Sequence, residues 1–78
     1  MFDEIKAILI EQAQIEADAI VPSAELVADL GLNSLELADL MLTCEEKFDI
    51  EVKEEAIKQF IRVSDIVDYI ESETGAAR

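Results

Sequence analysis

The stretch that decides the fold spans residues 29 to 48 and reads Asp29-Leu-Gly-Leu-Asn-Ser-Leu-Glu-Leu-Ala-Asp-Leu-Met-Leu-Thr-Cys-Glu-Glu-Lys-Phe48. Its apolar residues recur every three or four positions, which predicts an amphipathic helix over residues 34–48. Asn33 followed by Glu36 is a capping-box pair and marks the start of that helix. Gly31 just before it permits the positive φ of a sharp entry into a helix.

This predicted helix carries two apolar stripes. At about 100° per residue, the core-facing stripe consists of Leu37, Leu40, Met41, Cys44 and Phe48. The second stripe, with the acidic residues beside it, consists of Leu35, Ala38 and Leu42, flanked by Asp39, Glu45 and Glu46. Since a helix of a small bundle needs only one apolar face, the second stripe indicates a docking surface for partners with apolar and basic groups. The alternative is a helix buried on two sides, or scattered exposed leucines, which are common.

The rest of the chain also favours helices. Two Gly, one Pro and the absence of hairpin signals predict an all-α fold, a small four-helix bundle with three longer helices and one short one. The other helices are expected at residues 2–14, 53–59 and 63–73, with Gly75 ending the last and residues 75–78 fraying. The whole of 1–78 is expected to be a single domain.

A long connection, residues 15–32, separates the first two predicted helices. Pro22 keeps Val21 out of helical geometry, and Ser23 is expected to cap a short turn over residues 24–26. Such a connection packs its own apolar residues or carries function. The expected packing anchors are Ile20, Leu26, Val27, Leu30 and Leu32.

Charge and residue content exclude several classes of protein. With 19 Asp and Glu against 6 Lys and Arg, the net charge is -13, so nucleic acids and anionic membranes repel the chain and partners with basic patches are expected. The absence of His and the single Cys44 exclude a Ser-His pair, a disulfide and the usual zinc sites. A calcium loop counted from Asp29 would place Ser34 and Leu40 where Gly and Glu are required, so no metal site is expected. No apolar run spans a membrane and the N-terminus is acidic, so we expect a cytoplasmic monomer.

Ser34 stands at the start of the predicted helix, between its two apolar stripes. On position alone, Asn33 or Ser34 is an ordinary helix cap. With no His and no evident catalytic Lys nearby, Ser34 cannot be a self-sufficient nucleophile. A chemical role for its hydroxyl therefore requires a second enzyme that supplies the base.

At these residues the sequence resembles the acyl carrier protein family. The resemblance rests on Asp29-Leu30-Gly31-Leu32-Asn33-Ser34-Leu35, continues through residues 45–50, and resumes at Val67-Asp68-Tyr69-Ile70. It implies that a phosphopantetheinyl transferase attaches 4'-phosphopantetheine from coenzyme A to Ser34. The thiol of that arm then holds acyl groups as thioesters, so the protein is a carrier and not an enzyme.

The resemblance also implies two further sets of site residues. Partner docking is expected at Asn33, Leu35, Glu36, Ala38, Asp39, Leu42, Glu45 and Glu46. The lining of an acyl pocket is expected to be Leu40, Met41, Cys44, Phe48, Phe60 and Tyr69. Besides the transferase, the implied partners are acyl-transfer, ketosynthase or ligase enzymes with basic docking patches.

Two residues depart from the family pattern. Asn33 replaces the usual Asp before the serine, which removes a negative charge where the transferase approaches. Arg62 stands where a Thr-like cap is common, so Ser64 could shift the start of the last helix. The expected pathway is fatty acid or lipid biosynthesis. The alternatives are a specialised carrier for a cell-envelope lipid, a polyketide or an aminoacyl group and, in a different class, a non-covalent acidic helical adaptor.

Overall fold

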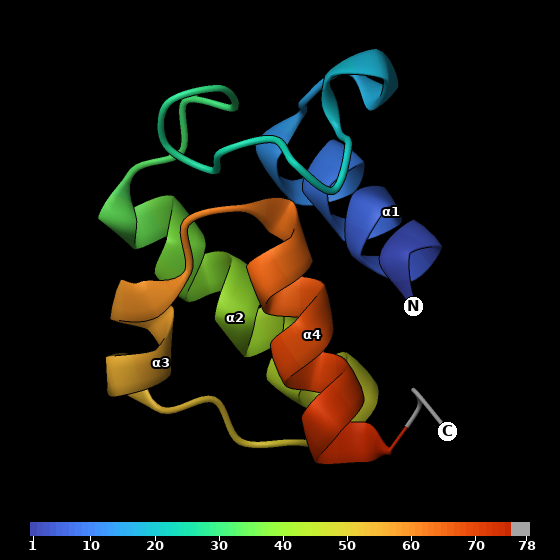
Figure 1. Cartoon of the computed structure of the whole chain (residues 1–78), viewed down its shortest axis with the longest axis vertical. Helices are drawn as coiled ribbons and strands as arrows, with labels where there is room; N and C mark the ends of the chain where they lie inside the picture. The colour runs from blue at the N-terminus through green and yellow to red at the C-terminus, as the bar shows by residue number, and fades with distance from the viewer. Residues whose placement is uncertain (76–78) are drawn as a thin grey trace.

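A computed structural model of the chain describes residues 1–75 and shows a bundle of helices (Figure 1). The helices are α1 (Phe2–Ala13), a short 3-10 turn (Ala17–Ala19), α2 (Ser34–Phe48), α3 (Glu54–Gln59) and α4 (Val63–Thr74). Within the described residues there is no strand, only an isolated antiparallel bridge between Glu25 and Arg62. The predicted all-α bundle with three longer helices and a short one is therefore confirmed.

The helix ends follow from local backbone geometry. The predicted bounds of α2 are confirmed, with Asp49 ending it in a left-handed conformation at φ 54°. α1 stops one residue earlier than predicted because Gln14 adopts φ 56°, and α3 starts one residue later because Lys53 is its extended N-cap. Gly75 caps α4 at φ 74°, and the rest of the predicted frayed tail, residues 76–78, lies outside the described residues. These shifts of one residue leave the arrangement of helices unchanged.

The core lies where α1, α2 and α4 converge, with α1 packed against both other helices. Of the predicted core stripe of α2, Leu37, Leu40, Met41 and Cys44 are buried, whereas Phe48 is only partly buried at the end of the helix. α4 buries Val63, Ile66 and Ile70 at helical spacing. The short α3 buries no residue and packs against α2.

The long connection is anchored by fewer residues than expected. Ile20, Leu26 and Leu32 are buried and Leu30 is half-buried, but the prediction for Val27 was wrong, since its side chain is 61% exposed. The turn spans residues 26–30, not 24–26, and sends Leu26 inward and Val27 outward.

Side-chain and backbone bonds fix that turn. Asp29 Oδ2 accepts a hydrogen bond of 2.7 Å from the Glu25 amide, and Gly31 takes the expected positive φ of 71°. Ser23, expected to cap the turn, is exposed and makes no side-chain hydrogen bond within residues 1–75. The Asp29 carboxylate therefore performs the role expected of Ser23.

The connection is tied to the start of α4 by backbone hydrogen bonds. The Leu26 amide donates to the Ile61 carbonyl at 2.8 Å, the Val63 amide to the Ala24 carbonyl at 3.0 Å, and the Ser64 amide to the Pro22 carbonyl at 2.9 Å. These bonds hold a segment of the first half of the chain against the entry to the last helix.

α4 begins at Val63 with Arg62 as its N-cap, so Ser64 does not shift the start of the helix. Asp65 Oδ2 accepts hydrogen bonds of 2.9 Å from the amides of Ile61 and Arg62. These bonds lower the pKa of the Asp65 carboxyl because they stabilise its charged form, and the bond from the Arg62 amide has the largest effect. A carboxylate inside the helix thus replaces the Thr-like cap.

No helix within residues 1–75 has the length and apolarity needed to cross a membrane.

Candidate functional site

Ser34 is the first residue of α2, and its side chain is exposed. The cap is Asn33, whose Oδ1 accepts from the Glu36 amide at 2.8 Å, while Glu36 Oε1 accepts from the Asn33 amide at 3.0 Å. This is the predicted capping box. The Ser34 hydroxyl makes no hydrogen bond to any of residues 1–75, so it is not the helix cap and it faces outward unengaged.

A hollow of about 260 Å³ adjoins this hydroxyl. Its lining comes from the first half of α2 and from α3, and consists of Ser34, Ala38, Glu54, Ile57 and Lys58. Ala38 and Ile57 offer apolar contact. The Lys58 ammonium and the N-terminus of α2 favour a negatively charged group, whereas the Glu54 carboxylate opposes it. An exposed hydroxyl beside such a hollow fits a phosphate-linked aliphatic arm.

The sequence interpretation missed Lys58 and the hollow. The only local signal was the spacing of Glu54 and Lys58, which is that of a helical i, i+4 pair. That spacing says nothing about which neighbouring helix α3 faces.

The second apolar stripe of α2 lies at the surface. Leu35 is 71% exposed and Leu42 56% exposed, whereas Ala38 is half-buried against α3. α2 is therefore not buried on two sides, and two large apolar side chains stand on its outer face next to Ser34. The use of this face for docking remains a prediction.

The acidic residues of α2 divide into two groups. Asp39 and Glu46 are exposed and free of ion pairs within the described residues. Glu36 belongs to the capping box, and Glu45 Oε2 accepts a hydrogen bond of 2.8 Å from the Val52 amide. Glu45, expected to serve docking, therefore also holds the loop after α2.

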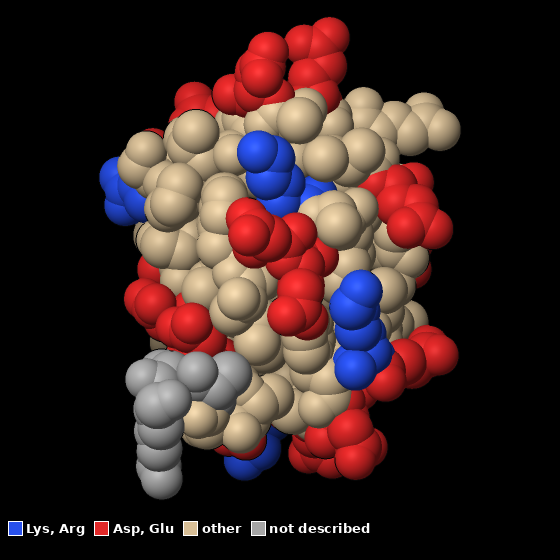
Figure 2. All heavy atoms as spheres, turned by 90° about the vertical axis from the view of Figure 1, so that its right-hand side faces the viewer, with Lys and Arg blue, Asp and Glu red and all other residues tan. Residues whose placement is uncertain are grey.

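The surface as a whole is strongly acidic. Figure 2 shows Asp and Glu side chains distributed over one face of the molecule, with fewer Lys and Arg side chains between them. Within residues 1–75 the one ion pair joins Arg62 to Glu25 at 3.9 Å between side chains that are about half exposed. Most carboxylates therefore remain available to a basic partner.

The residues expected to line an acyl pocket lie together, in and around the core. Leu40, Met41, Cys44 and Phe60 are buried, and Phe48 and Tyr69 pack against them. The rings of Phe60 and Tyr69 meet edge to face at 5.5 Å. Leu40 also lines the groove between α1 and α2, and the role of all six residues toward an acyl chain remains a prediction.

Cys44 is a core thiol. It is fully buried, and burial raises its pKa to about 11 although Lys47 opposes the shift. A thiol in this state is protonated and unreactive at neutral pH.

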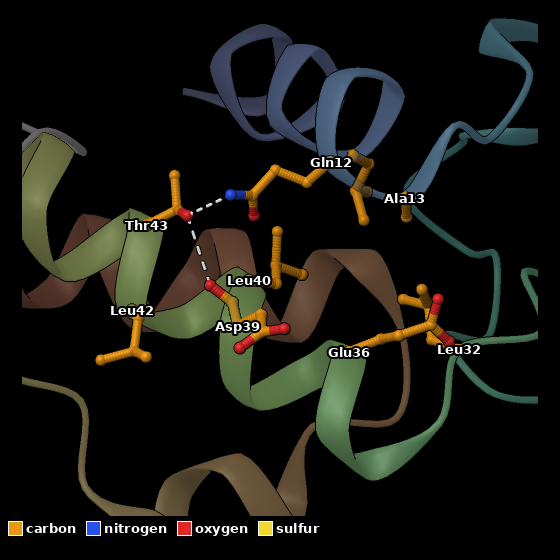
Figure 3. A pocket seen from close by; sticks show the side chains of 9 residues that line it. Gln12, Ala13, Leu32, Glu36, Asp39, Leu40, Leu42 and Thr43 are labelled. Carbon is orange, nitrogen blue, oxygen red and sulfur yellow. Dashed lines mark hydrogen bonds between the residues drawn. The ribbon is translucent and has the colours of Figure 1, made fainter.

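A larger hollow of about 400 Å³ lies on the other flank of α2, between α1 and α2 (Figure 3). Its lining consists of Leu9, Gln12, Ala13, Leu32, Glu36, Asp39, Leu40, Leu42 and Thr43. No sequence pattern indicates this groove, because the pattern along one helix does not say how closely a second helix approaches it.

The bundle therefore presents an exposed serine, which is not the helix cap, at the start of an acidic helix. The family model described as "Phosphopantetheine attachment site" matches residues 3–70. The chain is 41% identical over 71 residues to the acyl carrier protein of Helicobacter pylori strain J99, and this alignment covers 91% of each of the two chains. It is 38% identical over 71 residues to the acyl carrier protein of Campylobacter jejuni strain RM1221, covering 91% of this chain and 92% of that one.

The chain therefore belongs to the acyl carrier protein family. Its prosthetic group is 4'-phosphopantetheine, and its role is to carry acyl groups and not to catalyse their reactions.

Proposed function

We propose that Ser34 is the attachment point of 4'-phosphopantetheine. The observation that carries this proposal is the outward-facing Ser34 hydroxyl. It is not needed to cap α2, because Asn33 and Glu36 form the capping box. The adjoining hollow with Ala38, Ile57 and Lys58 supplies contacts for the part of the arm nearest the protein.

The attachment needs no base from this chain. A bond forms between Ser34 Oγ and the phosphorus that bears pantetheine, as the pyrophosphate bond of coenzyme A breaks and its nucleotide half leaves. The serine proton passes to a base of the phosphopantetheinyl transferase, since the chain has no His. The arm then presents its thiol for acyl groups, and tethering raises their local concentration at a partner's active site.

The exposed face of α2 is the proposed docking surface for the transferase and for acyl-handling enzymes with basic patches. Leu35 and Leu42 would supply apolar contact, and Asp39 and Glu46 would supply free negative charge. Asn33, Glu36, Ala38 and Glu45 complete the surface, although three of these four also hold α2 or its following loop in place.

We further propose that the carrier serves fatty acid or other lipid biosynthesis in the cytoplasm, as a single domain over residues 1–78. The match of this chain to acyl carrier proteins over 91% of its residues supports a role in acyl transfer. The core shared by α1, α2 and α4 supports one folding unit.

The test is the intact mass of the protein after incubation with coenzyme A and a broad-specificity transferase. Wild-type protein and the control Ser23→Ala should each gain one phosphopantetheinyl group, because Ser23 is an exposed serine that lies outside α2. Ser34→Ala should gain none. An unchanged gain in Ser34→Ala, or no gain in the wild type, would refute the attachment point and favour a non-covalent acidic adaptor.

A further inference from the structure

The two flanks of α2 next to Ser34 differ in charge. On the α1 side, the carboxylates of Glu36 and Asp39 border the groove between α1 and α2 (Figure 3), and no Lys or Arg of the described chain lines it. On the α3 side, the hollow beside Ser34 contains the Lys58 ammonium. A negatively charged group attached at Ser34 is therefore repelled by the α1 flank and attracted by Lys58.

Lys58 is free to interact with such a group. Its side chain is exposed and forms no ion pair or hydrogen bond with any of residues 1–75. Glu54 lines the same hollow and lies one helical turn before Lys58, but the two side chains do not form an ion pair. The Lys58 charge is therefore not neutralised by direct contact, although the Glu54 carboxylate weakens the attraction.

Asn33, the residue before Ser34, adds no charge of its own to this balance. Its Oδ1 accepts the hydrogen bond from the Glu36 amide that caps α2. The cap is thus made without a carboxylate next to the attachment oxygen. Among the residues that line the hollow, Glu54 alone opposes Lys58.

The hollow also offers apolar surface close to the positive charge. Ala38 from α2 and Ile57 from α3 are half-buried, and they line the hollow together with Ser34 and Lys58. In 4'-phosphopantetheine, the phosphodiester is followed by a methylene and then by a carbon that bears two methyl groups. A negative charge and a compact apolar group therefore stand side by side in the arm, as a positive charge and an apolar wall do in the hollow.

We propose that Lys58 is a positioning residue that directs the prosthetic arm away from α1 and onto α3. Its ammonium pairs with the phosphodiester at Ser34 Oγ, while Ala38 and Ile57 contact the two methyl groups next to that phosphodiester. A partner therefore receives the acyl group from the α3 side of α2. This inference rests on the proposed attachment at Ser34 and adds the direction that the arm takes.

The test is an NMR experiment on the full chain carrying the arm, after intact mass has confirmed its attachment. The measured quantity is the nuclear Overhauser effect between the two methyl groups of the arm and the Ile57 side chain. The same effect to Ala13, which lines the groove on the α1 side, provides the comparison.

Four variants separate the role of Lys58 from overall charge. Lys58→Gln removes the attracting charge, Lys58→Arg keeps it, and Glu54→Gln removes the opposing charge. The matched control Lys47→Gln removes an exposed lysine near the other end of α2, about 20 Å along the helix axis from Ser34.

The wild type should show the effect to Ile57 and not to Ala13. Lys58→Gln should reduce the effect on the order of threefold, as expected for the loss of one exposed ion pair, and Glu54→Gln should increase it. Lys58→Arg and Lys47→Gln should stay near the wild-type value. Salt at about 1 M should reduce the wild-type effect toward that of Lys58→Gln, because salt screens exposed charges.

Several results would overturn the inference. A loaded wild-type chain with no effect to Ile57, or with an equal effect to Ala13, would refute the proposed direction of the arm. Equal decreases in Lys58→Gln and Lys47→Gln would show that only the net charge matters. A wild-type chain that gains no arm mass would instead refute the attachment at Ser34, so the two failures can be told apart.

Discussion

Glu45 provides the sharpest test of how α2 is held, because its carboxylate performs a structural task on a helix otherwise rich in free acids. Glu45 Oε2 accepts a 2.8 Å hydrogen bond from the Val52 amide, and this part-buried bond fixes the loop between α2 and α3. Glu46, the next residue, is exposed and makes no such bond. The variants Glu45→Ala and Glu46→Ala therefore form a matched pair.

The expected magnitude follows from what the two variants share. Each variant removes one of 19 acidic residues and raises the helix propensity of α2 by a similar amount. These two effects therefore cancel when the free energies of unfolding of the two variants are compared. What remains is the hydrogen bond to a charged acceptor, typically worth about 1.5–3 kcal/mol. Because Glu45 is only half-buried, we expect Glu45→Ala to be about 1–2 kcal/mol less stable than Glu46→Ala.

The assay is urea denaturation followed by circular dichroism, with thermal melting as a second measure. In a domain of this size, 1 kcal/mol shifts the melting temperature by about 4–8 °C. Equal free energies of unfolding for the two variants would show that the Glu45–Val52 bond does not stabilise the fold. The expected loss also means that Glu45→Lys would mix unfolding with weaker docking, whereas Asp39→Lys tests docking cleanly.

Three further predictions concern other groups in the fold. The folded-state pKa of Asp65 lies below its ordinary value of 3.8, so the stability that its carboxylate contributes is present above pH 3.8 and is lost as the pH falls through the folded-state pKa. Asp65→Asn should therefore lower the melting temperature at neutral pH, and the difference in melting temperature from wild type should become smaller in acid. The exposed control Asp68→Asn should show no such change with pH. Because the pKa of Cys44 is about 11 against an ordinary 9.0, its reaction with an aromatic disulfide at pH 8 should be slower than in urea-unfolded protein by on the order of a hundredfold, and comparable rates would contradict its burial. Urea denaturation should show that Met41→Ala lowers the free energy of unfolding by about 2–5 kcal/mol. Phe48→Ala should lower it by about 2 kcal/mol, because the Phe48 ring is only partly buried. A decrease above about 3 kcal/mol for Phe48→Ala would place that ring in the core.

Local sequence signals predicted the helices well. The bounds of α2 were set by the Asn33–Glu36 capping box and by apolar spacing, both of which act within a few residues. Gly31 and Gly75 likewise took the positive φ values that only glycine adopts freely. Ser34 could be singled out because the family motif surrounds it in the sequence.

Interactions that reach beyond a single helix could not be predicted in this way. The exposure of Val27 depends on a turn whose geometry Asp29 fixes, and the Glu45–Val52 bond depends on how the next loop folds back. The two hollows beside α2 depend on how α1 and α3 approach it. Periodicity describes one face of one helix and carries no information about these distances.

The bonds that join residues 22–26 to residues 61–64 have a consequence for synthesis of the protein. The Val63 amide reaches the Ala24 carbonyl across a large part of the chain, so native contacts of high contact order complete the bundle. A nascent polypeptide that ends before residue 63 lacks the Val63 and Ser64 amides, which donate the hydrogen bonds from α4 to residues 22–24. We therefore expect the native bundle to form only after residues 61–64 have left the ribosome, so that another enzyme meets α2 in its folded form only from that point on.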